Sequence, residues 1–365
     1  MMTYRLPAEW EKHESTWLSW PYNLDTWHHD SHIQAQISFL KFIKIIQKGE
    51  TINLIVNDLE TRDKVLNLAS QQDISLHNTI FHYQETNDAW IRDYGPDFLI
   101  GDTTTKTLNW QYNAWGNKYP YTKDNKISQY ISNQNPQFQS KNIDFVLEGG
   151  SFEANGNGLL ITTESCLLHP TRNPKYTKAQ IEKILKKEFY QDEIIWLKNG
   201  IAGDDTDGHI DDFARFISQN TILIASEKRK ENINHPPITE NINLLKKINQ
   251  NRKNKLNIIE IPMPHNHIFF KEELLPASYL NFYICNHAVI VPIFNDPNDQ
   301  VAINIIASQI NRLVIGVNAR EIIVGLGAFH CLSKHEINHK TIKRISTKTY
   351  PSTDGSLTQP YSKWG

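Results

Sequence analysis

TINLIVN, residues 51–57, is a short apolar run rich in β-branched side chains, and it predicts a buried strand. A helical pattern follows it over residues 59–69. A Thr-x-x-Gln cap at Thr177 predicts the start of a second helix, and residues 193–197 are expected to form the strand after it. Strands and helices therefore alternate along the chain, which indicates an α/β fold.

The alternation continues through the second half of the chain. Asn155-Gly156-Asn157-Gly158 predicts a hairpin turn, because Gly and Asn tolerate positive φ. The polar stretch 117–142 is expected to be a surface excursion and is a candidate lid. No linker or internal repeat stands out, so a single domain over residues 1–365 is expected. Further strands are expected at 221–225, 257–262, 282–294 and 313–325, and further helices near 239–251 and 299–310.

Composition and charge narrow the class of protein. Asp and Glu number 40 and Lys and Arg 38, and no block of like charge resembles a tail that binds nucleic acid or lipid. The N-terminus has no apolar region typical of a secretory signal, and no run approaches the ~18 apolar residues of a membrane span. Only three cysteines are present, so a disulfide framework is not expected, and a reducing cytoplasm is the expected compartment.

One imidazole lies among five carboxylates in the acidic loop, GDDTDGHIDD at residues 203–212. This concentration of negative charge predicts a cationic ligand, and the alternative is a solvated acidic surface. His209 and Asp211 are two residues apart, so in an extended segment both side chains leave the same face. Both could then reach one small ligand.

Two earlier segments also carry chemically useful side chains. NDAWIRDYGP, residues 87–96, combines Trp90 with an arginine and two acids, of which Asp93 is the second. LEGGSF, residues 147–152, places Glu148 at an expected strand end, before two glycines that allow backbone or ligand to approach closely. Taken singly, each of these side chains could serve the core, a turn or a local ion pair instead.

A thiol lies in a glycine-rich segment near the end of the chain. GLGAFHCL, residues 325–332, brings Cys331, preceded by His330, to an expected strand end. A thiol near a histidine is a candidate nucleophile, because such sites are defined by spatial roles and not by sequence proximity. Cys166 and Cys285 lie in apolar runs and are expected to be structural.

These four segments, in this order, resemble the agmatine deiminase and bacterial peptidylarginine deiminase-like family of the guanidine-modifying, or pentein, superfamily. The resemblance spans nearly the whole chain, from WLSWP at residues 17–21 and NAWG at residues 113–116 to Cys331. It implies one α/β propeller of pseudo-fivefold symmetry, built from ββαβ-type units, with the site at the centre of the ring.

The resemblance also implies roles for individual residues. Cys331 stands where the family has its nucleophile, and His209 stands where it has the general acid/base. Glu148 matches the carboxylate that partners the histidine and the substrate. Asp93 and Asp211 match the two carboxylates that hold the guanidinium.

The implied chemistry is consistent with these residue types. Trp90 matches an aromatic side chain beside the substrate. A guanidinium presents several in-plane N–H donors, which carboxylates match in geometry. Thiolate attack on its carbon, with a proton donated by His209 to departing ammonia, gives a thiouronium intermediate, and His209 then activates water to release a urea. No metal, redox cofactor or nucleotide is needed, so no cofactor is expected.

The implied enzyme is a hydrolase that acts on the C–N bonds of linear amidines. A chain without a secretory signal favours agmatine as substrate and N-carbamoylputrescine as product, which is a step of putrescine and polyamine metabolism. A deiminase of another guanidine, such as peptidyl-arginine, remains the alternative, because residues 328–329 and 332–335 differ from those expected in the family. A non-catalytic guanidinium-binding protein is a further alternative, and the sequence leaves homo-oligomerisation open.

Two metal motifs compete with this interpretation. HEINH, residues 335–339, matches the H-E-x-x-H signature of zinc peptidases, which requires a helix and a third ligand. No histidine follows His339, and Asp354 is the only later acid, so a zinc peptidase is disfavoured. The acidic loop does not fit an EF-hand, because Gly203 and Ala214 would occupy positions one and twelve.

Overall fold

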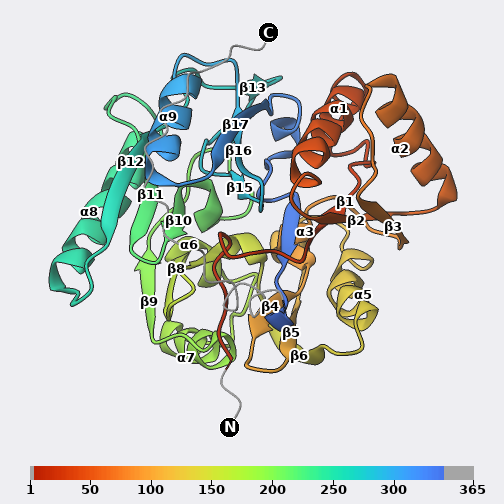
Figure 1. The fold of residues 1–365 in the computed structure, drawn as a ribbon. Helices are drawn as coiled ribbons and strands as arrows, with labels where there is room; N and C mark the ends of the chain where they lie inside the picture. The colour runs from red at the N-terminus through yellow and green to blue at the C-terminus, as the bar shows by residue number, and fades with distance from the viewer. Residues whose placement is uncertain (1–3, 341–365) are drawn as a thin grey trace, which may run out of the picture.

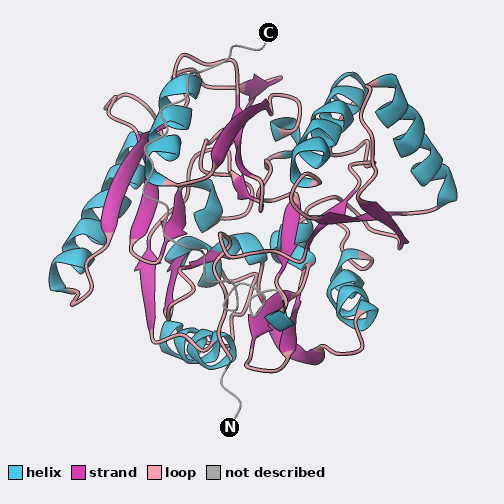
Figure 2. Cartoon of the chain, viewed as in Figure 1, coloured by secondary structure: helices cyan, strands magenta, loops and turns pink. Residues whose placement is uncertain are grey.

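A computed structural model describes residues 4–340 of the chain, and these residues form a mixed α/β fold (Figures 1 and 2). Four three-stranded sheets share one topology: the first two strands are antiparallel, and the third lies parallel to the second after a helical connection. They are β4 (Asp97–Ile100), β5 (Thr105–Gln111) and β6 (Gln139–Val146); β7 (Phe152–Ala154), β8 (Leu159–Thr163) and β9 (Glu193–Leu197); β10 (Ala214–Ser218), β11 (Thr221–Ser226) and β12 (Asn257–Pro262); and β15 (Tyr283–Ile284), β16 (Ala288–Ile293) and β17 (Leu313–Asn318).

A fifth sheet joins the two ends of the described chain. Its order is β18 (Ser333–Glu336), β1 (Ser15–Ser19), β2 (Thr51–Val56) and β3 (Thr79–Tyr83). β18 is antiparallel to β1, and β1 is parallel to β2, so this sheet repeats the topology of the other four and adds β3. A short hairpin pairs β13 (Phe269–Phe270) with β14 (Glu273–Leu274).

The helices connect the strands, and the long ones lie toward the periphery of the view in Figure 1. The α-helices are α1 (His29–Ile46), α2 (Leu59–Gln71), α3 (Ile91–Tyr94), α4 (Ala114–Asn117), α5 (Ile127–Gln134), α6 (Glu164–Leu167), α7 (Lys178–Phe189), α8 (His235–Asn251) and α9 (Asp299–Gln309). Single turns of 3₁₀-helix are η1 (Asp124–Lys126), η2 (Gly149–Ser151), η3 (Ile210–Asp212) and η4 (Ile323–Gly325). Within the described residues, no helix is both long and apolar enough to cross a membrane.

Several of the predicted elements are confirmed. The strand and helix expected from residue 51 onward are β2 and α2. Thr177 caps α7 in a reciprocal capping box with Gln180, and β9 follows as expected. β7 and β8 form the predicted hairpin, and Gly156 and Gly158 adopt φ values of +71° and +85° in its turn, a region that favours glycine.

The prediction of a polar surface excursion at residues 117–142 is only partly right. Much of the stretch is exposed, but it contains α5 and the first half of β6, and Ile127 and Ile131 of α5 are fully buried. The two isoleucines are four residues apart and so share one helical face, which many polar neighbours obscure in the sequence.

Two predicted strands and one helix have different bounds. The strand expected at 282–294 is interrupted between β15 and β16, where the chain turns back so that the two strands pair. The strand expected at 313–325 ends at Asn318, before η4. α8 begins at His235, four residues before the predicted start, because proline is tolerated in the first turn of a helix.

A large apolar core fixes the segment that carries the thiol. Phe329 is fully buried, and its ring stacks on Phe42 of α1 with centroids 4.8 Å apart. The amide N–H of Leu332 donates to the carbonyl of Ala328, which closes a tight turn around Cys331. The segment between η4 and β18 is therefore held by packing and by its own backbone hydrogen bonds.

Candidate active site

Three of the four segments singled out in the sequence line one cavity of about 420 Å³. Trp90 and Asp93 come from the region of α3, Asp205 comes from the acidic loop, and Cys331 comes from the segment before β18. Glu148 does not line this cavity, although it lies close behind it. The topology thus brings together side chains that are up to 241 residues apart in the sequence, from Trp90 to Cys331.

Cys331 lies between η4 and β18, not at the end of a preceding strand as expected. Its side chain is buried, and Asn281 Nδ2 lies 3.0 Å from its Sγ. Asp211 Oδ2 lies 3.6 Å from the same sulfur. Burial raises the pKa of the Cys331 thiol well above its ordinary value, and the neighbouring carboxylates of Asp211, Asp212 and Asp93 raise it further. The thiol therefore keeps its proton until positive charge arrives.

Glycine is required beside the thiol. A Cβ at Gly327 would lie 2.6 Å from the Trp90 ring and 3.0 Å from the Cβ of Cys331. Trp90 itself packs on Trp27, with ring centroids 5.2 Å apart. The predicted aromatic side chain thus forms a wall of the cavity next to the thiol.

Asp93 is held in place by two donors. The backbone N–H of Gly150 donates to Oδ1 at 2.8 Å, and Trp115 Nε1 donates to Oδ2 at 2.9 Å. Burial raises the pKa of Asp93 to about 6, although these hydrogen bonds oppose the rise. Asp93 does not pair with its neighbour Arg92, whose Nη2 instead bonds to Glu9 at 3.0 Å. The local ion pair considered for Asp93 in the sequence is therefore absent.

His209 and Asp211 meet Asp93 at a turn. His209 Nδ1 lies 3.8 Å from Asp93 Oδ1 and 3.9 Å from Asp211 Oδ1. The segment is not extended as predicted: η3 begins directly after His209, and this turn brings the two side chains together. Burial lowers the pKa of His209 to about 4, despite the opposing charge of Glu148 and other acids, so the imidazole is neutral at pH 7.

Three buried polar atoms at this point have no hydrogen-bond partner: both ring nitrogens of His209 and Oδ1 of Asp211. Buried polar atoms are almost always hydrogen-bonded, so unpartnered ones beside a cavity indicate a ligand site. His209 and Asp211 are both fully buried. The alternative of a solvated acidic surface is therefore wrong for this part of the loop.

The other acids of the loop have structural partners. Asp204 accepts hydrogen bonds from the backbone N–H groups of Thr206 and Gly208. Lys118 Nζ bonds to Asp205 and Asp207 at 3.2 and 3.1 Å. The number of acids in the loop therefore overstates the negative charge that faces a ligand. Backbone N–H groups of the loop bind Asp204, and Lys118 binds Asp205 and Asp207.

Glu148 lies beside His209 but bonds to a residue that the sequence did not indicate. Its Oε1 accepts from Arg172 Nε at 2.7 Å, and its Oε2 is buried without a hydrogen-bond partner. Arg172 also pairs with Asp207, and its side chain is fully buried. Nothing in the sequence around Arg172 indicates that it bonds to Glu148. The same is true of Asn281 and its contact with Cys331.

Two sets of potential metal ligands occur within residues 4–340. Glu148, Cys166 and His209 form one set, and Asp211, Asp212 and Cys331 form the other, with donor atoms within 4.8 Å of one another in each set. Only Cys331, from the second set, lines the cavity. Cys166 was expected to lie in an apolar strand-like run, but it lies in the short helix α6, fully buried.

The HEINH segment does not have the geometry of a zinc-peptidase motif. His335 and Glu336 lie in β18, and His339 follows the strand. Neighbouring side chains of a strand point to opposite faces, so this motif lacks the helical face that places both histidines on one metal. Glu336 accepts hydrogen bonds from Ser15 and Trp17, which ties it to β1.

A buried thiol in the wall of a cavity, with a neutral imidazole and unpartnered carboxylate oxygens behind it, is an arrangement suited to a cationic ligand. The model of the Porphyromonas-type peptidyl-arginine deiminase family matches residues 5–336. The chain belongs to this family, which confirms the resemblance seen in the sequence.

Individual relatives extend over nearly the whole chain. The agmatine deiminase of Pseudomonas aeruginosa (strain LESB58) is 31% identical over 359 residues, which are 91% of this chain and 95% of the relative. A solved cysteine-to-serine variant of the C. jejuni agmatine deiminase, with substrate bound, is 32% identical with a TM-score of 0.83, covering 92% of this chain and 96% of that one. The agmatine deiminase of Enterococcus faecalis superimposes with a TM-score of 0.85 at 28% identity, with the same two coverages.

Proposed function

We propose that this protein is an agmatine deiminase, which hydrolyses the guanidinium of agmatine to N-carbamoylputrescine and ammonia. The observation that carries the proposal is the set of unpartnered buried atoms of His209 and Asp211, together with the contact of 3.6 Å between the other oxygen of Asp211, Oδ2, and the Sγ of Cys331. The names of the relatives support the same activity. The proposed catalytic residues are Cys331, His209, Glu148, Asp93 and Asp211.

The guanidinium is proposed to lie between Asp93 and Asp211. Asp93 Oδ1 and Asp211 Oδ1 both lie within 4 Å of His209 Nδ1, so their acceptors face a common space. Charge-assisted hydrogen bonds from the planar N–H groups would fix the carbon in front of Cys331 Sγ. Trp90 would flank the bound group as the aromatic wall of the cavity.

Substrate binding would also activate the nucleophile. Burial and nearby carboxylates raise the pKa of the Cys331 thiol, so a bound cation next to the sulfur acts in the opposite direction. The thiol proton passes to neutral His209, and the thiolate attacks the guanidinium carbon to form a C–S bond. The C–N bond then breaks as His209 returns that proton to the departing ammonia.

Hydrolysis of the resulting thiouronium uses the same imidazole. His209 accepts a proton from water, and the hydroxide adds to the carbon. The C–S bond then breaks as the added hydroxyl passes its proton to the sulfur, which releases the urea product and regenerates the thiol, and the proton on His209 leaves to water. Glu148 is proposed to stabilise His209 in its protonated form, because its carboxylate favours positive charge on the ring. Arg172 would hold the Glu148 carboxylate in position.

The substrate is tested by ammonia release from agmatine, free arginine and a blocked arginine ester. We expect kcat/KM for agmatine to exceed that for the other two by at least about tenfold, a difference of about 1.4 kcal/mol in transition-state stabilisation. A preference for the blocked ester would instead favour the peptidyl-arginine alternative. Release of ammonia from none of the three would contradict the proposed function.

Activity should survive exhaustive chelation. The proposed steps need only the thiol, the imidazole and the carboxylates, and HEINH begins in the strand β18 and not in a helix. The measurement combines elemental analysis with assays before and after dialysis against a strong chelator. Stoichiometric metal whose removal abolishes turnover would overturn this part of the proposal.

We further propose that the five sheets are arranged with pseudo-fivefold symmetry around the site, as one catalytic domain over residues 1–365. The repeated strand order of the five sheets supports this arrangement, as do the peripheral helices in Figure 1. Residues 341–365 lie outside the described part of the chain. A reducing cytoplasm is the proposed compartment, supported by three free, buried cysteines.

A further inference from the structure

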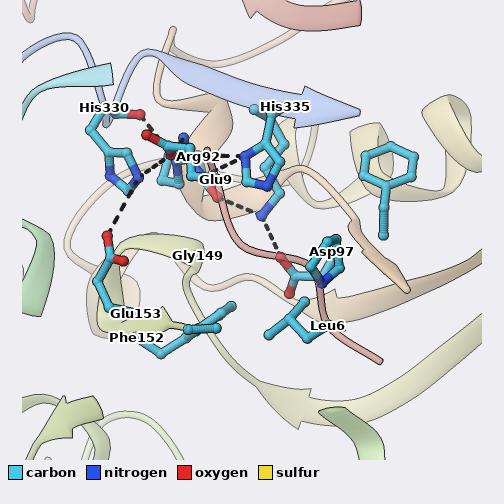
Figure 3. A pocket seen from close by; sticks show the side chains of 13 residues that line it. Leu6, Glu9, Arg92, Asp97, Gly149, Phe152, Glu153, His330 and His335 are labelled. Carbon is cyan, nitrogen blue, oxygen red and sulfur yellow. Dashed lines mark hydrogen bonds and ion pairs between the residues drawn. The ribbon is translucent and has the colours of Figure 1, made fainter. Parts of the chain in front are cut away.

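His330, the residue before Cys331, lines a second, smaller cavity of about 40 Å³ (Figure 3). Asp93 and Cys331 line the large cavity, whereas the residues that precede each of them, Arg92 and His330, line the small one. His330 is almost fully buried, and its backbone carbonyl accepts a hydrogen bond from Arg92 Nε at 3.1 Å. The imidazole thus forms part of the wall directly behind Asp211.

The two ring nitrogens of His330 bond to two different carboxyl groups. Nδ1 lies 2.6 Å from Asp211 Oδ2, and Nε2 lies 2.9 Å from Glu9 Oε2. Asp211 Oδ1 faces the other way, toward His209, and has no partner. One carboxyl group therefore offers one oxygen to the proposed guanidinium and the other to His330.

Glu9 is ionised, which determines where the hydrogens lie. Its two oxygens also contact Arg215 at 2.9 Å and Arg92 at 3.0 Å, and Oε1 accepts the backbone N–H of Ile284 at 2.9 Å. Burial raises the pKa of Glu9, but Arg215, His330 and Arg92 outweigh it and hold this pKa well below its ordinary value. An ionised carboxylate only accepts hydrogen bonds, so Nε2 of His330 carries a hydrogen.

The contact between His330 and Asp211 then requires one further proton. With hydrogen on Nε2, a neutral ring has only a lone pair at Nδ1, and an ionised Asp211 also has only lone pairs. Two acceptors do not approach to 2.6 Å without a hydrogen between them. One proton is therefore shared, either as the acid form of Asp211 or as the imidazolium form of His330.

The groups around this pair favour the proton on Asp211 when no cation is bound. Burial raises the pKa of Asp211 well above its ordinary value, and Asp93 raises it further. Burial lowers the pKa of His330, as do Arg215 and Arg92, although Glu9 opposes them. The charged groups that face the ring are Asp211 from η3, Glu9 from the N-terminal segment, Glu153 from β7, Arg92 from α3 and Arg215 from β10. Lys334 and His335 of β18 line the same small cavity.

We propose that His330 is a positioning residue that takes up the proton of Asp211 when a guanidinium binds, so that Asp211 becomes an ionised acceptor. The O–H bond of Asp211 breaks and an N–H bond forms at Nδ1, which leaves an imidazolium between Asp211 and Glu9. The proton stays in the protein, and the binding reaction requires no proton release to water. This inference rests on the proposed function, because it assumes that the cavity binds a guanidinium.

The test measures proton release on agmatine binding to the Cys331→Ser protein, by calorimetry in buffers of different ionisation enthalpy. At a pH about two units above the pKa of Asp93, where Asp93 is already ionised, we expect no net release with His330 present. His330→Gln keeps an amide near Glu9 but leaves Asp211 without its partner, so we expect close to one proton to be released. Below the pKa of Asp211, the affinity of this variant for agmatine should also increase by up to tenfold for each unit by which the pH is raised, because the acid form of Asp211 must ionise before the guanidinium binds.

A conservative variant separates this role from simple packing. His330→Asn places an amide donor near the position of Nδ1. In the protein that retains Cys331, its kcat/KM should therefore be at least about tenfold higher than that of His330→Gln. Equal activity of the two variants would overturn the inference, as would release of one proton by the protein that retains His330. Absence of agmatine binding to the Cys331→Ser protein would instead count against the proposed function itself.

Infrared difference spectroscopy provides a test that does not alter His330 and so does not depend on folding of its variants. In the Cys331→Ser protein, agmatine binding should remove the C=O band of a protonated carboxyl group. The same band should be missing from the difference spectrum when Asp211→Asn is added. An unchanged carboxyl band on saturation with agmatine would contradict the proposed proton transfer.

Discussion

Cys331→Ser is expected to lower kcat by far more than tenfold while the protein stays folded and still binds agmatine. A hydroxyl is much less nucleophilic than a thiol at neutral pH, and it cannot readily supply the charged nucleophile. The substitution removes little volume, and backbone hydrogen bonds hold the chain on both sides of this residue.

The measurement is steady-state ammonia release together with calorimetric binding of agmatine. Cys285→Ser is the matched control, because Cys285 is an equally buried thiol that accepts a hydrogen bond from the backbone N–H of Ala288. It should retain a kcat close to that of the unmodified protein. A Cys331→Ser protein with more than about a tenth of the original kcat, a barrier change below about 1.4 kcal/mol, would exclude Cys331 as nucleophile.

Asp93→Asn and Asp211→Asn are each expected to lower kcat/KM by at least about tenfold. Each removes a carboxylate proposed to bind the guanidinium, and a charge-assisted hydrogen bond is worth about 1.5–3 kcal/mol. The Asp93 change also disturbs the carboxylate that Gly150 and Trp115 hold. Steady-state kinetics with agmatine measures both effects.

His209→Asn should produce a different pattern. The variant lacks the group that protonates departing ammonia, so the loss should fall on kcat while KM changes little. Asp144→Asn is the control for loss of an acid, because the Asp144 side chain is 95% exposed and should be silent. Near-normal kcat/KM for both Asp93→Asn and Asp211→Asn would show that the guanidinium binds elsewhere.

The α/β class could be predicted from the sequence because local patterns indicate where helices and strands lie. β2, α2 and α7 follow apolar periodicity and a capping box, which are local properties. The strand order could not be derived in this way. β18 pairs with β1 across more than 300 residues, and no periodic pattern specifies such a partner.

The candidate site was found through residue types that are costly to bury without a reason. His209, Asp211 and Cys331 stood out, and all three are buried beside one cavity or its wall. Asn281 and Arg172 were missed, because an amide or an arginine gains its role only from partners that the fold supplies. The acidic loop was overinterpreted, because several of the carboxylates that suggested a cationic ligand instead bond to the loop itself and to Lys118.

Mass spectrometry of the enzyme quenched with acid during turnover is the most direct test of whether Cys331 forms a covalent intermediate. We expect a covalent adduct whose mass equals agmatine less ammonia, located by peptide mapping on Cys331 and lost as the thiouronium is hydrolysed. Steady turnover with no adduct on Cys331, or with an adduct on Cys166 or Cys285, would contradict this expectation.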